Sequence, residues 1–379
     1  MERGLTGTPD RLVSIVLVTW NSAAWLPRCL AAIAQQTWPS LELIAVDNAS
    51  QDDSPSVLET LGSRPELGRR VPVTIIRNAS NAGFSRAVNQ AIEAASGAFV
   101  LLINPDASME RDYLEQLIHA FDAAGEAFGA ATGLLMRGEG NGITPTDIVD
   151  SMGIRMTRSG RHLDVGQGRR LGEDKRGLRE LQTADRRPQT ADSLADHEHV
   201  DHDGEPNRGL RSAVCGPVYE VFGVSGAAAL FRMSFIRDLS IDGEFLDEDF
   251  FAFREDADLA WRGRIFGWRA LCVPAAVGAH VRTVTPERRR DVPPAINMHS
   301  VKNRFLLRLK NEGAWLALRN APFEIARDLV TIGAVLTVER TSLPALSWLW
   351  RNRSRIRERR RHVQRRRRVS DRSLAGWFR

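Results

Sequence analysis

Residues 98–108 read AFVLLINPDAS: six apolar residues that stop at an asparagine, a proline and an aspartate. A short apolar run that ends at turn-forming residues is typical of a strand buried on both faces of a parallel sheet. Asn104 and Asp106 are two residues apart, so their side chains point the same way if the segment is extended. The stretch therefore predicts a buried strand that presents an amide and a carboxylate where it ends.

Three more apolar runs precede this one, and helical patterns lie between them. Strands are expected at Val13–Thr19, Leu41–Asp47, Val73–Arg77 and residues 98–103. Helices are expected at roughly residues 23–36, 55–61, 82–95 and 109–123. This alternation predicts an α/β fold with a mostly parallel sheet flanked by helices. In such sheets ligands bind beyond the carboxyl ends of the strands.

The composition is that of a globular protein with an ample core, since 43% of the 379 residues are hydrophobic. Cys29, Cys215 and Cys272 are widely spread and form no CxxC pair, which favours a reducing compartment. The first ten residues lack the charged and apolar regions of a secretory signal. We therefore expect a cytoplasmic protein.

Charge is distributed unevenly along the chain. The net charge is +5, but residues 351–372 hold twelve arginines against Glu358 and Asp371, a local charge of +10. The rest of the chain is therefore mildly acidic, at −5. Aromatic and basic residues together suit a helix that lies on an anionic membrane, so we expect peripheral attachment to the inner face of the plasma membrane. A solvated basic helix and a nucleic-acid contact are the alternatives.

Two further segments differ from the rest of the sequence. Residues 172–212 are polar, rich in Asp, Arg and His, and are expected to form a mobile surface insertion to which no role is assigned. Its run HEHVDHD favours a solvated loop over a metal site. Residues 313–379 are expected to form a C-terminal helical extension that follows a catalytic domain at residues 1–312.

The ends of the predicted strands carry polar side chains. No GxGxxG follows the first strand, where the sequence is TWNSAAW, which argues against a nicotinamide or flavin enzyme. Helix capping could explain any one of these polar residues. Polar residues after three strands at one edge of a sheet instead favour a polar ligand. These residues are Thr19 and Asn21, Asp47 and Asn48, and Asn104 and Asp106. One carboxylate with one amide suits a divalent cation shared with a diphosphate.

An acidic cluster lies further along the chain. Seven acids between Glu244 and Asp258 alternate with four phenylalanines, a pattern unusual for a solvated face. Asp258 could simply complement the N-terminus of a helix that begins near Glu255. Glu255 and Asp256, at the mouth of an aromatic pocket, are better placed for general-base chemistry, because burial would raise the pKa of either carboxylate.

Taken together, these motifs resemble family 2 glycosyltransferases of the GT-A fold, especially the bacterial rhamnosyltransferase-like branch. The resemblance extends over roughly residues 12–310. It is carried by VSIVLVTWN (13–21), VDNASQDDS (46–54), NAGFSRAVN (81–89), LLINPD (101–106), SGAAAL (225–230), FFAFREDADL (250–259) and the later His280.

The resemblance implies roles for individual residues. The base and ribose of a nucleotide would be lined by Thr19, Asn21 and Asp47, and Asn48 would belong to the same donor-binding set. The donor pocket near the diphosphate would be shaped by Asn81, Gly83, Phe84 and Asn89. Asn104, also on the donor side, would stand in place of the first acid of the family's DxD motif. The divalent cation, Mg²⁺ or Mn²⁺, would be held by Asp106 and His280. Asp256, beside Glu255, would be the catalytic base, and Gly226 and Ala227 would border the acceptor.

The activity implied is inverting transfer of a sugar from a nucleotide-diphosphate donor to a hydroxyl of a glycan or lipid-linked glycan, in cell-wall or surface polysaccharide synthesis. The branch favours dTDP-L-rhamnose, with UDP-galactofuranose, UDP-hexose or GDP-mannose as alternatives. No nucleic-acid partner is expected. A rival from another class is a non-catalytic membrane- or nucleic-acid-binding protein built around the arginines, which would consume no nucleotide sugar.

Overall fold

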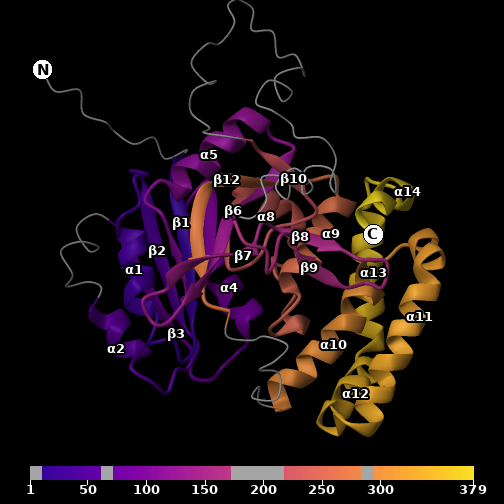
Figure 1. Ribbon diagram of the computed structural model, residues 1–379. Coiled ribbons are helices and arrows are strands. Elements are labelled where there is room, and N and C mark those ends of the chain that lie inside the picture. Colours follow the sequence, from indigo (N-terminus) through magenta and orange to yellow (C-terminus); the bar gives the residue numbers. More distant parts are fainter. Residues whose placement is uncertain (1–10, 61–70, 172–216, 283–293) are drawn as a thin grey trace, which may run out of the picture.

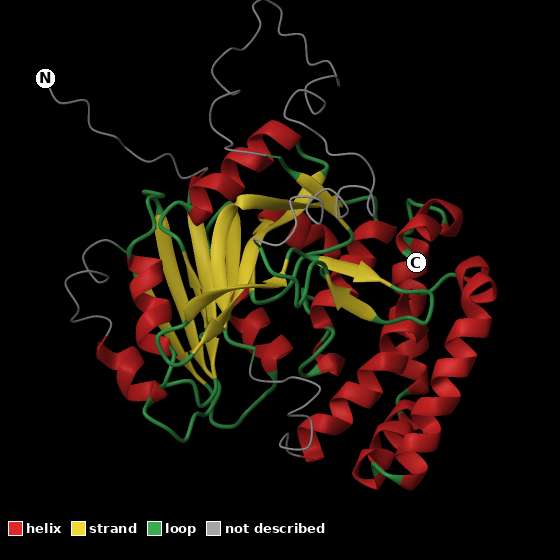
Figure 2. Ribbon diagram, viewed as in Figure 1, coloured by secondary structure: helices red, strands yellow, loops and turns green. Residues whose placement is uncertain are grey.

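The computed structural model describes residues 11–60, 71–171, 217–282 and 294–379. The predicted insertion at 172–212 and its histidine-rich run lie outside the described residues, as does Cys215. Figures 1 and 2 show a twisted sheet with helices on both faces and a group of helices at the C-terminal end of the chain.

The sheet is parallel in its N-terminal half. β1, β2, β3 and β4 pair in parallel in the order β4-β1-β2-β3, and Thr19 at the end of β1 lies beside Asp47 at the end of β2. The antiparallel β11 joins β4 to β6, which in turn pairs in parallel with β12. The strands of this sheet are β1 (Val13–Thr19), β2 (Leu41–Asp47), β3 (Val73–Arg77), β4 (Phe99–Ile103), β5 (Ala107–Met109), β6 (Phe128–Glu139), β7 (Thr144–Ser151), β10 (Tyr219–Val221), β11 (Ala228–Arg232) and β12 (Arg269–His280), while β8 (Ile154–Met156) and β9 (His162–Asp164) form a separate hairpin.

Alternate residues of the buried strands face two hydrophobic cores. In β1, Ile15 and Leu17 pack with helices α1, α2 and α5, whereas Val16 and Val18 pack with α4, α8 and α9. The strand is apolar throughout because both of its faces are covered. The expected fold class, a mostly parallel sheet flanked by helices with a C-terminal helical extension, is confirmed. These helices are α1 (Leu26–Ala34), α2 (Ser54–Glu59), α4 (Phe84–Glu93), α5 (Tyr113–Ala124), α8 (Met233–Leu239) and α9 (Glu255–Ile265).

The predicted strand ranges agree closely with the structure, but one predicted helix began too early. The helix expected from residue 109 begins at Tyr113, because residues 107–109 form β5, which pairs antiparallel with β12. In that pairing Ala107 lies opposite His280. The partner strand is far away in the sequence, so local periodicity carries no signal of this short strand. Its consequence is functional, since the pairing brings Asp106 next to His280.

The C-terminal helices pack onto the body rather than extending from it. Ile356, Val363 and Phe378 belong to the same core as β1 and α9. Arginines of the Arg-rich segment pair with acids of the body, including Arg359 with Glu244 at 2.6 Å and several contacts to Asp238. Part of this segment is therefore a counter-charge for the acidic body. The helices are α10 (Pro294–Asn311), α11 (Ala314–Thr337), α12 (Leu343–Arg351), α13 (Arg353–Arg365) and α14 (Asp371–Leu374).

A buried ion cluster attaches α10 to the acidic segment, residues 244–258. The Lys310 ammonium is fully buried and donates to Asp247 at 2.6 Å and to Asp258 at 2.7 Å. Burial alone would raise the pKa of Asp247, but Lys310 outweighs burial and holds this pKa well below its usual range. Asp258 also accepts hydrogen bonds from Arg262 and Asn311. Asp258 is thus an interior ion-pair partner and not merely a helix-terminal charge.

Replacement of Lys310 should strongly destabilise the fold. Lys310→Met leaves Asp247 and Asp258 buried with less counter-charge, which should lower the free energy of unfolding by about 3–5 kcal/mol. The measurement is chemical denaturation followed by circular dichroism. The control Arg77→Met breaks the exposed pair with Glu59 and should cost less than about 1 kcal/mol. Similar losses in the two variants would contradict the structural role of Lys310.

Candidate active site

The ends of β1 and β2 are joined by their own polar side chains. The Thr19 hydroxyl donates to Asp47 Oδ1 at 3.2 Å, and the Ser50 amide donates to the other oxygen at 3.2 Å. Asn21 has a left-handed backbone (φ 51°), and its Oδ1 accepts from the Gln51 amide at 2.8 Å. Three residues predicted to line the base and ribose therefore lie together at the carboxyl edge of the sheet.

Asn48 organises the loop that follows β3. Its side chain is almost fully buried, and its Oδ1 accepts from Asn78 Nδ2 and from the Ala82 amide, both at 3.0 Å. Its Nδ2 donates to Asn81 Oδ1 at 3.0 Å, and that oxygen also accepts from the Gly83 amide. Both ends of the Asn48 amide are thus occupied by the loop, so the residue shapes the pocket wall.

The start of α4 holds the acidic segment in place. Gly83 has a φ of 90°, and a Cβ at this position would come within 2.6 Å of the Phe251 ring. Asn89 donates to the Leu246 carbonyl at 2.8 Å and accepts from the Leu246 amide at 2.9 Å. Phe84 is partly buried against the core. Gly83 and Asn89, both expected to shape the donor pocket, therefore connect the predicted donor-binding motif to the segment that carries Glu255 and Asp256.

Asp106 and His280 form the second cluster at this edge. His280 Nε2 lies 3.4 Å from Asp106 Oδ1, while His280 Nδ1 contacts the fully buried Asp150 at 2.9 Å. Burial would lower the pKa of His280, but hydrogen bonds and the charges of the two carboxylates raise it to about 9. The backbone amide of Asn104 donates to the Ala227 carbonyl at 2.9 Å, which fixes the turn after β4.

Arg282 links this cluster to the acidic residues beyond it. It binds both oxygens of Asp150, at 2.8 and 3.2 Å, and reaches Asp164 at 2.7 Å. Side chains of alternating charge therefore run from His280 through Asp150 and Arg282 to Asp164. The charge of Asp164 reaches Asp256 as a like-charge effect.

The donor set fits a cation that brings most of its own ligands. No group of three or more His, Cys, Asp or Glu side chains that could hold a metal occurs among the residues that the structure describes. Asp106 and His280 could supply one oxygen and one nitrogen on neighbouring backbone segments, provided that the cation takes the place of the imidazolium proton. A hard divalent ion that completes its shell with water and phosphate oxygens suits such a sparse set.

Glu255 and Asp256 lie in the first turn of α9. Asp256 Oδ1 accepts from the Ala257 amide at 2.7 Å, and Oδ2 lies 3.4 Å from the amide of Gly226. Burial and the nearby Asp164 raise the pKa of Asp256 to about 6. Burial and the neighbouring Asp256 raise the pKa of Glu255 to about 8. Near neutral pH, Asp256 is the better proton acceptor of the two, and it lies beside the predicted acceptor border at Gly226 and Ala227.

The segment before these carboxylates is strained and is held by a residue that the sequence did not indicate. Phe251, Phe253 and Arg254 all have positive φ values, between 64° and 69°. Such conformations cost free energy in residues other than glycine. The fully buried Asn303 of α10 donates to the carbonyls of Phe250, Ala252 and Phe253 at 2.7–2.8 Å.

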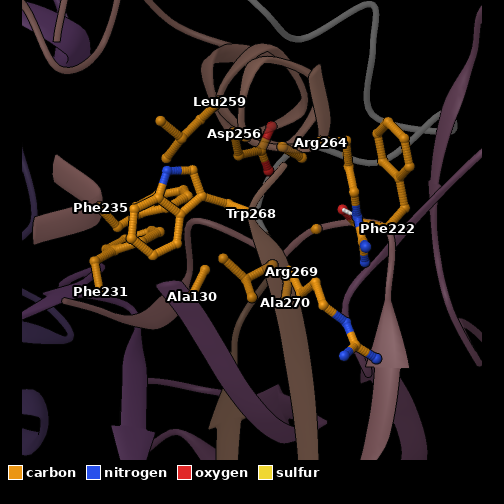
Figure 3. A pocket seen from close by; sticks show the side chains of 14 residues that line it. Ala130, Phe222, Phe231, Phe235, Asp256, Leu259, Arg264, Trp268, Arg269 and Ala270 are labelled. Atoms are coloured by element: carbon orange, nitrogen blue, oxygen red, sulfur yellow. Dashed lines mark hydrogen bonds between the residues drawn. The ribbon is translucent and has the colours of Figure 1, made fainter. Parts of the chain in front are cut away.

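A small cavity lies on the core side of Asp256 (Figure 3). Its walls include Phe231, Phe235, Leu259 and Trp268, and its volume is about 20 Å³. This volume holds about one water molecule. The cavity is therefore a packing gap behind the carboxylate and too small for a sugar.

Several residues of the site were missed by the sequence analysis. Asp150, Asp164, Arg282 and Asn303 all come from elements that are distant in sequence from their partners. A weak signal was present in residues 280–282, where His280 and Arg282 alternate as they would at the end of a strand. The buried acids were not indicated, because their positions depend on β7 and β9.

The first part of the chain matches a known family. Residues 14–158 match the model of the family described as Glycosyl transferase family 2. A PGL/p-HBAD biosynthesis glycosyltransferase of Mycobacterium bovis is 35% identical over 107 residues, which are 28% of this chain and 40% of that protein. Glycosyltransferase GlyA of Streptococcus pneumoniae is 28% identical over 108 residues, 28% of this chain and 15% of that protein. The matches span less than half the length of these relatives.

Among solved structures, the fold is similar to that of GalNAc-T7, determined with UDP, GalNAc and Mn²⁺. The TM-score is 0.52 at 13% identity, and the match covers 79% of this chain and 48% of that one. This likeness supports the GT-A type of architecture and concerns the fold alone. The comparisons carry no assignment to the rhamnosyltransferase-like branch.

Removal of the Asn303 side chain should loosen the strained segment. Asn303→Ala removes the two Nδ2 protons that are shared among three carbonyls, of which, among the described residues, only that of Phe250 keeps another donor, the Ala252 amide. Amides at 251–256 should therefore exchange with deuterium at least about tenfold faster, a change of about 1.4 kcal/mol in local opening. The matched control is Asn352→Ala, because Asn352 donates only within its own helical region, to the Trp348 carbonyl. Unchanged exchange in Asn303→Ala would show that other contacts hold the segment.

Proposed function

We propose that this protein is an inverting glycosyltransferase that moves a sugar from a nucleotide-diphosphate donor to an acceptor hydroxyl. The observation that carries the proposal is the presence of two side-chain sites at one end of the sheet, Asp106 with His280 and Asp256 with Gly226. Asp150 and Arg282 connect the first site to Asp164, whose charge acts on Asp256. The family match over residues 14–158 and the glycosyltransferase relatives support the same reaction class.

In the proposed reaction, Asp256 accepts the proton of the acceptor hydroxyl as its oxygen attacks the anomeric carbon of the donor. The nucleoside diphosphate leaves from the opposite face, so the anomeric configuration inverts. Thr19, Asn21 and Asp47 orient the nucleotide. Asp106 and His280 would hold a divalent cation, Mg²⁺ or Mn²⁺, which supplies electrostatic stabilisation of the leaving diphosphate when bound.

The donor and acceptor follow from the resemblance in the sequence. The preferred donor is dTDP-L-rhamnose, with UDP-galactofuranose, UDP-hexose and GDP-mannose as the other candidates, and the acceptor is a glycan or lipid-linked glycan. A panel of these nucleotide sugars with Mg²⁺ or Mn²⁺ discriminates among them through thermal stabilisation and nucleotide release. Failure of every donor to bind would favour the non-catalytic rival. A product that retains the donor's configuration would reject direct displacement.

Loss of the Asp256 carboxylate should affect turnover and spare donor binding. Asp256→Asn removes the proton acceptor but keeps the size of the side chain, so kcat should fall by about 10²- to 10⁴-fold. Donor affinity, measured by calorimetry, should stay within about threefold. Glu358→Gln, which removes a charge from an exposed position of α13, should leave both quantities unchanged. Near-normal turnover in Asp256→Asn would remove Asp256 from this role.

The pH dependence of the reaction should report the raised pKa of Asp256. The carboxylate accepts a proton only when ionised, so kcat/KM should rise with pH through a limb near 6. Asp164→Asn removes a negative charge that favours the protonated form and should move this limb to lower pH. The check is a pH–rate profile of both proteins. An unmoved limb would mean that another group controls the ascending side.

A further inference from the structure

The outer helix α11 has its polar and apolar sides reversed relative to a helix on the surface of a soluble protein. Its acids face inward: Glu324 is 7% exposed, and Asp328 is partly buried. Both pair with α10, where Arg308 lies 2.9 Å from Glu324 and Arg304 lies 3.2 Å from Asp328. A helix of a soluble protein ordinarily turns its charges to solvent. Here the charges hold the helix against the body.

The opposite side of α11 is apolar and exposed. The exposed fraction is 77% for Leu318, 67% for Leu329 and 54% for Leu336. At 100° per residue, the exposed apolar positions cover about 160° of the helix circumference. In Figure 1 the helix forms the outer edge of the molecule beyond α10 and α13. The exposed apolar set, which we name the α11 face, is Trp315, Leu318, Pro322, Phe323, Ile325, Ala326, Leu329, Val330, Gly333 and Leu336.

The helix pair of α11 and α12 also carries exposed arginines. Arg327, Arg340, Arg351 and Arg353 are exposed along α11, after its end and at the far end of α12. The exposed Trp350 of α12 lies beside Arg353, whose guanidinium is 4.8 Å from the ring centroid. The acids of α11 are turned away from this surface. An exposed apolar face on a helix pair that also carries exposed arginines and a tryptophan matches the interface of an anionic bilayer.

We propose that the α11 face lies in the headgroup region of an anionic membrane and attaches the protein to it. None of the described helices is by itself long and apolar enough to cross a bilayer, but α11 and α12 together meet the criteria of length and hydropathy across a bend of 108°. Two helices that pack together in a coiled coil need only a narrow apolar stripe. A wide apolar face on a bent helix pair is more typical of an element that lies on a membrane surface. The inference is independent of the reaction proposed above.

This placement differs from the one that the sequence suggests. The sequence attributes membrane attachment to the arginines after residue 350. In the structure, Arg355 pairs with Asp249 at 2.9 Å, and Arg359 and Arg366 pair with Glu244 and Asp238. These side chains are engaged with the body. Residues of α11 therefore provide the apolar contact, and the exposed arginines of the helix pair contribute the attraction to lipid charge.

The experiment is co-sedimentation of the full chain with vesicles of phosphatidylglycerol and phosphatidylcholine. Wild-type protein should bind these mixed vesicles and bind phosphatidylcholine alone more weakly. A variant with Leu318→Gln, Ile325→Gln, Leu329→Gln and Leu336→Gln should show at least about a tenfold lower partition coefficient. The double variant Leu329→Gln, Leu336→Gln should fall between the two, and it serves in place of the fourfold variant should that one fail to fold.

The matched control changes charge and leaves the α11 face intact. Arg357→Gln, Arg361→Gln and Arg365→Gln alter three exposed positions of α13 and should keep most of the binding. The proposal is overturned if wild-type protein does not bind the mixed vesicles, or if only the arginine variant loses binding. It is also overturned if wild-type protein is a dimer and the fourfold variant a monomer, since a second copy would then cover the face. Nucleotide release without vesicles, measured in parallel, reports on the reaction separately.

Discussion

The attachment of α10 to the acidic segment is the constraint on which the rest of the site depends. Lys310 neutralises Asp247 and Asp258 at one end of this contact, and Asn303 holds the strained carbonyls at the other. The segment between them leads directly into Glu255 and Asp256. Four of the seven acids that looked like one catalytic cluster in the sequence, Glu244, Asp247, Asp249 and Asp258, therefore serve to hold the other residues in position.

The site also contains charged side chains that are buried away from solvent. Asp150 is inaccessible to solvent, and burial alone would raise its pKa, but His280 and Arg282 lower it below the usual range. His280 and Arg282 thus stabilise the ionised Asp150, whereas the charge of Asp164 disfavours ionisation of Asp256. This arrangement keeps a carboxylate ionised near the predicted diphosphate site while Asp256, at the far end, retains a pKa suited to proton transfer.

Much of the fold could be predicted because its signals are local. The ranges of β1, β2 and β3 follow from apolar runs of five to seven residues, and the polar ends of the strands follow from the edge rule for parallel sheets. The unpredicted features depend on long-range pairing: β5 needs β12, and Asn303 lies about fifty residues from the carbonyls that it binds. The Arg-rich segment was visible as a charge pattern, but its partners on the body were not, because the composition of one segment does not identify the acids it meets. The boundary predicted at residue 312 stays a prediction.

The inward charges of α11 have a consequence for how the chain can vary and be divided. Arg304 and Arg308 of α10 form ion pairs with Glu324 and Asp328, which both lie after residue 312. A chain that stopped at the end of α10 would keep these two arginines but would lack the carboxylates with which they form ion pairs. The two helices are therefore coupled by charge: removing an acid of α11 would weaken the pairing of an arginine of α10, and a transplanted N-terminal region would keep these ion pairs only if α11 were carried with it.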